Sequence, residues 1–166
     1  MQPVSPTGRD AVVFSALAGL ETGVLGGVGL LAWLGAGSLI AGNPIWWGPV
    51  SLATAAFGSG VSGGGFLPAG VVGAALQLVA AGLVGTLFGL CMRARWALQR
   101  VVLIGLLFGL GWYYLGYELL LRRFGLGMHG VAPRRSLLVA HLFFGLVLAA
   151  YPRLASALDT GPRSGG

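Results

Sequence analysis

Long uncharged runs of hydrophobic residues dominate the chain, and short segments rich in Gly, Pro or Arg separate them. Four runs have about the length that a helix needs to cross a hydrocarbon layer of roughly 30 Å, at 1.5 Å per residue. Because peptide groups must be paired in lipid, each run is expected to be an α-helix. The pattern predicts an all-α, polytopic integral membrane protein with a four-helix transmembrane bundle. The expected crossings are residues 11–40, 69–92, 101–121 and 136–151.

The segment between the first two crossings has a weaker pattern. Residues 45–57 are uncharged and contain Trp46 and Trp47, which suit the headgroup boundary, and a glycine-rich run over 58–65 follows. We expect a short interfacial or re-entrant segment over 45–57. A full crossing is the alternative, but irregular backbone in lipid would leave peptide groups unpaired.

The two ends of the chain are expected to lie outside a single transmembrane domain, residues 11–151. Residues 1–10 form a short N-terminal tail, and the apolar run that follows is too long for a cleaved signal peptide. Pro152 and Arg153 are expected to end the fourth crossing. The polar tail over 152–166 is then predicted to be disordered.

Charge is scarce, and its distribution fits a membrane protein. Only 8% of the residues are charged and 56% are hydrophobic, with a mean hydropathy of +0.87, whereas soluble domains carry about 25% charged residues. The formal net charge of +6 comes from Arg residues between apolar runs, where they act as membrane-edge anchors. The expected partner is a lipid bilayer, with other membrane-protein subunits or self-association as further candidates, and no nucleic acid.

The placement of Arg gives a weak prediction of orientation. If the N-terminus is inside, Arg9, Arg93, Arg95, Arg100, Arg153 and Arg163 lie inside, whereas Arg122, Arg123, Arg134 and Arg135 lie outside. Basic residues favour the cytoplasmic side. We therefore expect both termini in the cytoplasm, and a bacterial inner (plasma) membrane.

Small residues recur every four positions along the expected helices. Such stripes let helix backbones approach closely in a membrane. They can hold one monomer together, or they can serve an oligomer or a partner subunit. The helix-packing candidates are Gly19, Gly23 and Gly27 on the first helix, Ala81, Gly85 and Gly89 on the second, Gly105 and Gly109 on the third, and Gly145 on the fourth.

Glu21 is the first polar residue that could carry a function. If the helix begins near Ala11, Glu21 lies near the middle of the bilayer, where a carboxylate must face the bundle, be protonated or line water. The alternative places the crossing at 22–42, which is uncharged and long enough to span, and leaves Glu21 at the interface.

Glu118 and His141 are the other two intramembrane candidates. Glu118 precedes Arg122 by four residues, a favourable order for a helical ion pair. Because the last two crossings run antiparallel, Glu118 and His141 are expected at similar depth, where they can form a structural hydrogen bond or a proton relay. The outer arginines Arg122, Arg123, Arg134 and Arg135 are candidate contacts for anionic lipid.

The sequence favours a protein without catalytic chemistry. With one Cys and two His it lacks the ligand spacing of a zinc site, and it has no His-Glu-x-x-His motif. We expect no catalytic residues, no metal and no cofactor. The leading hypothesis is a non-enzymatic accessory or scaffold component that packs against other membrane helices or lipid. The alternative is a small oligomeric transporter or proton-conducting protein that uses Glu21 and a Glu118–His141 pair, and a membrane enzyme acting on lipid ranks third.

Overall fold

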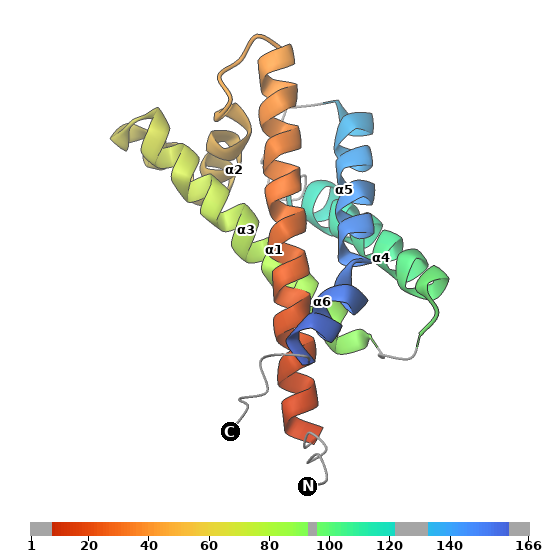
Figure 1. Ribbon diagram of the computed structural model, residues 1–166. Helices are drawn as coiled ribbons and strands as arrows, with labels where there is room; N and C mark the ends of the chain where they lie inside the picture. Colours follow the sequence, from red (N-terminus) through yellow and green to blue (C-terminus); the bar gives the residue numbers. More distant parts are fainter. Residues whose placement is uncertain (1–7, 93–95, 122–132, 160–166) are drawn as a thin grey trace, which may run out of the picture.

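The computed structural model describes residues 8–92, 96–121 and 133–159, and every regular element in these ranges is helical (Figure 1). The expectation of an all-α protein with four long apolar helices is confirmed. A short helix also lies between the first two of them, where the sequence predicts one. The elements are α1 (Gly8–Ile40), α2 (Trp47–Phe57), the 3₁₀ helix η1 (Ser59–Gly64), α3 (Phe66–Cys91), α4 (Leu98–Tyr113), the π-helix η2 (Tyr114–Leu121), α5 (Arg134–Leu148) and α6 (Tyr151–Asp159).

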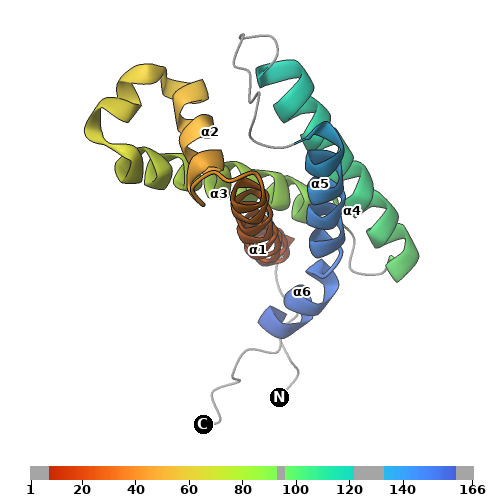
Figure 2. The same cartoon turned by 90° about the horizontal axis from the view of Figure 1, so that it is seen from above.

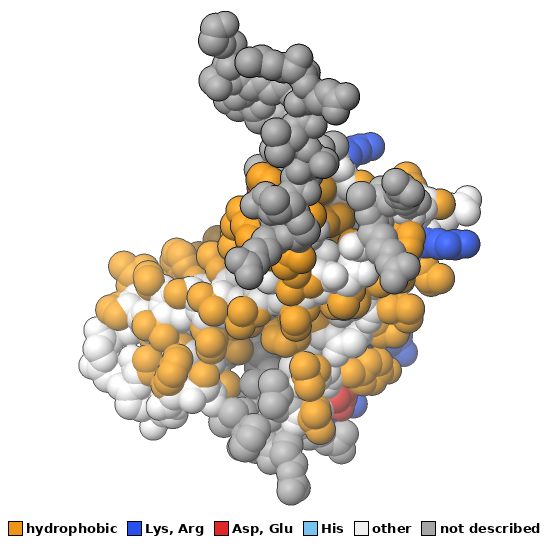
Figure 3. Space-filling model, turned by 90° about the horizontal axis from the view of Figure 1, so that it is seen from below, with side chains coloured by type: hydrophobic (Ala, Val, Ile, Leu, Met, Phe, Trp, Pro, Cys, Tyr) orange, Lys and Arg blue, Asp and Glu red, His pale blue; other side chains and the backbone are white. Residues whose placement is uncertain are grey.

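Four stretches have the length and apolar composition of membrane spans, which makes the chain a small four-span membrane protein. They are Ala11–Ile40, Leu67–Cys91, Leu98–Leu119 and Arg134–Ala155. Hydrophobic side chains cover much of the described surface in Figure 3, as expected of a surface that meets lipid rather than water.

Helices α1 and α3 cross in close contact through their small residues. A Cβ atom added to Gly23 would lie 2.8 Å from Gly85 Cα, and one added to Gly19 would lie 2.9 Å from Gly89 Cα. A Cβ added to Gly27 would meet that of Ala81 at 2.8 Å. Because these separations are shorter than real Cβ contacts, larger side chains would force the two backbones apart.

Helices α4 and α5 pack in the same way. A Cβ atom on Gly109 would lie 3.1 Å from Gly145 Cα, and one on Gly145 would lie 2.9 Å from Leu106 Cα. The carbonyl oxygens of Gly105 and Gly145 each lie where the other glycine would carry a side chain. In both helix pairs, the small residues therefore serve contacts within one chain.

Helix α1 lies between two groups of helices (Figures 1 and 2). On one side it packs against α3, which also carries α2, and on the other side it packs against α5, which pairs with α4. Helices α3 and α4 diverge from each other (Figure 2). Phe88 joins the groups, because its buried ring lies 5.3 Å from that of Phe108 and 6.1 Å from that of Tyr151.

Helix α2 packs along α3, with one very close approach between backbones. The carbonyl oxygen of Pro49 lies where a side chain on Gly73 would begin. Val50 and Ala53 on the same helix are buried. The glycines that flank η1, Gly58 and Gly65, have φ angles of 80° and 109°, which residues with a side chain rarely adopt.

The predicted disorder of the polar tail over 152–166 is wrong for its first part, because residues 151–159 form helix α6. Pro152 is tolerated in a first helical turn, where its missing N–H has no partner to lose. Tyr151 is buried, and Ala155 packs against the same hydrophobic cluster. The helix is therefore stabilised by packing near α1. The polar composition of the tail gives no indication of this packing. Residues 160–166 lie outside the described part of the chain.

Candidate functional site

Glu21 lies on the outer surface of α1, within the apolar part of the bundle. Its neighbours Gly19 and Gly23 both contact Gly85 of α3, so Glu21 lies level with that residue. Gly85 precedes Cys91, the end of α3, by six residues, which is about 9 Å along a helix. The Glu21 side chain is nevertheless exposed. The carboxylate of Glu21 therefore faces outward from the bundle.

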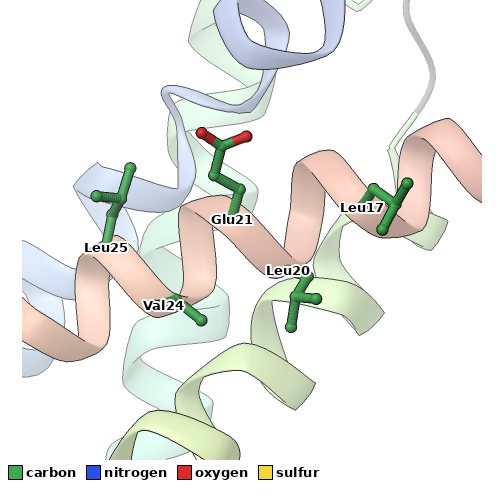
Figure 4. Close-up of a pocket in the computed structure, with 5 residues that line it drawn as sticks. All are labelled: Leu17, Leu20, Glu21, Val24 and Leu25. Carbon is green, nitrogen blue, oxygen red and sulfur yellow. The ribbon is translucent and has the colours of Figure 1, made fainter. Parts of the chain in front are cut away.

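A shallow groove of about 480 Å³ surrounds this carboxylate. Leu20 and Val24 point toward α3, where a Cβ on Gly82 would meet them, whereas the carboxylate of Glu21 points to another side of α1 (Figure 4). Within the described residues, Glu21 has neither a hydrogen bond nor a salt bridge. We call this surface the Glu21 groove; its lining residues are Leu17, Leu20, Glu21, Val24 and Leu25.

A second group of polar and aromatic residues lies where α4 and η2 meet α5. Glu118 Oε1 lies 3.8 Å from Nη1 of Arg134, the first residue of α5. Arg134 remains 62% exposed and Glu118 23% exposed, so the pair is only partly shielded from its surroundings. Exposed pairs of this kind contribute little stability, about 0–1 kcal/mol.

His141 binds within its own helix and does not reach Glu118. Its Nδ1 lies 2.8 Å from the carbonyl oxygen of Leu137, and because a carbonyl only accepts, this bond places the proton on Nδ1. The imidazole packs edge-on against Tyr113, with ring centroids 5.6 Å apart. The expected Glu118–His141 pair is therefore not formed.

The helix register explains why this expectation fails. Gly109 faces the carbonyl of His141 in the antiparallel pair. Glu118 lies nine residues further along its helix, so it reaches the beginning of α5, where Arg134 is located. Glu118 is therefore level with a position about two helical turns before His141. Depth measured from the arginines at the helix ends does not reveal this offset. Aligning the small residues of the two helices, Gly109 with His141 and Gly105 with Gly145, does reveal it.

Tyr113 is the centre of the aromatic group. It is buried, stacks on Tyr117 at 5.6 Å with nearly parallel rings, and meets Tyr114 edge-on at 5.3 Å. Nearby, Trp33 Nε1 of α1 donates a hydrogen bond to Ser136 Oγ of α5 at 2.9 Å. Neither the Trp33–Ser136 bond nor the π-helix η2 is predicted by the sequence pattern. A π-helix is rare and frequently accompanies a functional position.

Two of the four candidate lipid-binding arginines belong to the described part of the chain. Arg134 and Arg135 lie exposed at the beginning of α5, next to Pro133. Arg122 and Arg123 lie outside the described residues, and so does the expected Glu118–Arg122 pair. The role of these arginines in binding anionic lipid therefore stays a prediction.

In the described ranges, no three His, Cys, Asp or Glu side chains gather in a way that could hold a metal ion. Comparison with known proteins finds no protein-family model, no curated protein and no solved structure that matches this chain. Within the described residues, the Glu21 groove is the feature that a surrounding lipid bilayer does not explain, because lipid offers no partner to its carboxylate.

Proposed function

We propose that this chain is a non-enzymatic subunit of a larger membrane assembly, and that it packs α1 against a helix of another membrane protein. The observation that carries the proposal is the outward-facing carboxylate of Glu21 in an apolar groove. Insertion scales give a cost of about 2.5–3.5 kcal/mol for a charged side chain at the centre of a membrane helix, and charged residues anywhere within membrane helices usually face protein or water rather than lipid. A neighbouring protein would supply the environment that lipid lacks.

The internal packing supports the same proposal. The small-residue stripes of α1, α3, α4 and α5 are occupied within the chain, and Leu20 and Val24 are the groove residues that face α3. Leu17 and Leu25, at the two ends of the groove, are 48% and 52% exposed. Leu17, Glu21 and Leu25 can therefore contact another helix without disturbing the packing of α1 on α3.

Photo-crosslinking in native membranes tests this proposal. A photoreactive amino acid at Leu17 or Leu25 is expected to give a discrete adduct with one other membrane protein. The matched control is Leu103 on α4, which is 59% exposed and is expected to give lipid adducts. Lipid adducts alone from the groove positions, adducts between two copies of this chain, or the same protein adducts from Leu103 would contradict the proposal.

A further inference from the structure

The Glu21 groove has the spacing of a helix-packing surface. Its lining residues recur at i, i+3, i+4, i+7 and i+8 along α1, with Leu20 and Val24 on the side toward α3 and Glu21 on the side away from it. Val28, which continues this spacing, is 51% exposed. An open apolar stripe of this kind suits the side chains of a second helix that crosses α1, because helices are the spanning elements that pair their own peptide groups in lipid.

From these features we infer that the Glu21 groove receives a transmembrane helix of a different protein that carries one Arg or Lys facing Glu21. This inference rests on the proposed function, and it specifies the chemistry of the partner. Opposite charges inside a membrane stabilise one another, because the surrounding lipid solvates neither of them. A lipid acyl chain would fill the apolar part of the groove but would leave the carboxylate without a partner.

A second copy of this chain fits the groove less well. Two copies related by a twofold axis present the same surface to each other, which would bring one Glu21 toward the other. Two carboxylates that share a site repel one another unless one is protonated. Charge complementarity therefore favours a different chain with a basic side chain.

The depth of Glu21 also restricts where the basic residue of the partner lies. Glu21 is level with Gly85, which is six residues, or about 9 Å, inside the end of α3. The partner helix is expected to carry its Arg or Lys about six residues inside the same membrane boundary. At that depth a long basic side chain can approach Glu21 while it stays near the membrane edge.

The charge preference can be measured with synthetic helices. The full-length protein is labelled at Cys91, its single and exposed cysteine, and reconstituted in phosphatidylcholine vesicles. Energy transfer then reports the association of acceptor-labelled Leu/Ala transmembrane peptides that carry Arg, Leu or Glu six residues from one end. We expect the Arg peptide to bind about 10-fold more tightly than the Leu peptide, and the Glu peptide to bind most weakly.

Two variants test whether Glu21 causes this preference. Glu21→Gln keeps the size of the side chain and is expected to reduce the difference between the Arg and Leu peptides to less than about two-fold. Glu21→Lys is expected to transfer the preference to the Glu peptide. Equal binding of the Arg and Leu peptides by the unaltered protein, or an Arg preference that survives Glu21→Gln, would overturn the inference.

The failure of this inference can be distinguished from the failure of the proposed function. Protein crosslinks from Leu17 and Leu25 without any charge preference would retain the subunit proposal and reject a basic partner. An Arg preference that depends on Glu21, without any protein crosslink in native membranes, would support the chemistry of the groove and reject the subunit proposal.

Discussion

Glycine acts in this protein through the side chain it lacks. Gly23 and Gly37 both lie in α1, but a Cβ on Gly23 would lie 2.8 Å from Gly85 Cα, whereas a Cβ on Gly37 would meet nothing within 4 Å. The same residue type is therefore required at one position and replaceable at the other. Sequence spacing selects Gly23 as one member of a stripe, but only the structure identifies the opposing backbone.

This contrast gives a stability prediction with a built-in control. Gly23→Ala is expected to destabilise the protein by about 1–3 kcal/mol, because the added methyl group must push α1 away from α3. Gly37→Ala is expected to leave stability unchanged or slightly raised, since a helical Ala has less freedom to lose on folding. Thermal unfolding in detergent measures both. Equal melting temperatures for the two variants would mean that α1 and α3 are not in close contact.

At the scale of whole elements, few polar contacts connect the helices. The Trp33–Ser136 bond connects α1 to α5, and the Glu118–Arg134 pair connects η2 to the beginning of α5. Both lie at the end of the bundle where α4 continues as the π-helix η2. This end therefore combines polar pairs with the apolar cluster around Tyr113, whereas the helix crossings depend on backbone contact.

The Trp33–Ser136 bond can be measured by a double-mutant cycle. Trp33→Phe and Ser136→Ala each remove one partner, and the double variant is expected to be less destabilised than the sum of the single variants. Intramembrane hydrogen bonds usually give a coupling of about 0.6 kcal/mol, and at most about 1.7. Strictly additive changes in the free energy of unfolding would show that the bond does not contribute.

The attachment of α6 to the bundle predicts that the ring of Tyr151 contributes strongly to stability. Tyr151 is 4% exposed and its ring meets that of Phe88. Tyr151→Ala should destabilise the protein by about 3–5 kcal/mol, the usual loss for a large buried aromatic side chain, whereas Tyr151→Phe should retain most of the stability. Amide exchange over residues 153–158 provides a local measurement. Protection that is unchanged in Tyr151→Ala would contradict the attachment of α6 through this residue.

For the whole molecule, hydropathy was sufficient to predict the four long helices and the short helix between the first two. It could not predict α6, because Tyr151 and Ala155 find apolar partners that only the folded chain supplies. The expected Glu118–His141 pair was wrong, because it was inferred from the distance of each residue to the arginines at the helix ends. The relative depth of two residues depends on the register between their helices, which the contact of Gly109 with the carbonyl of His141 determines. Glu21 was recognisable as exceptional from the sequence, but its outward direction depends on which face of α1 the glycines occupy.

The four-span topology makes a final prediction about the two sides of the membrane. The end of α3 and the beginning of α5 lie at opposite ends of the bundle (Figure 1). Leu98 and Arg135 are both exposed near these ends. In a Cys91→Ala background, Leu98→Cys is expected to react with an impermeant maleimide from the cytoplasmic side and Arg135→Cys from the opposite side.

Neither substitution is expected to change the orientation of the protein in the membrane. Leu98→Cys alters no charge, and Arg135→Cys removes an arginine from the side expected to be external, so it strengthens the excess of basic residues inside. Labelling of both cysteines from the same side would contradict four crossings. Labelling of Leu98→Cys from the external side and of Arg135→Cys from the cytoplasm would retain the fold and reverse its orientation. In that case the excess of Arg expected on the cytoplasmic side would not have determined how the chain inserts.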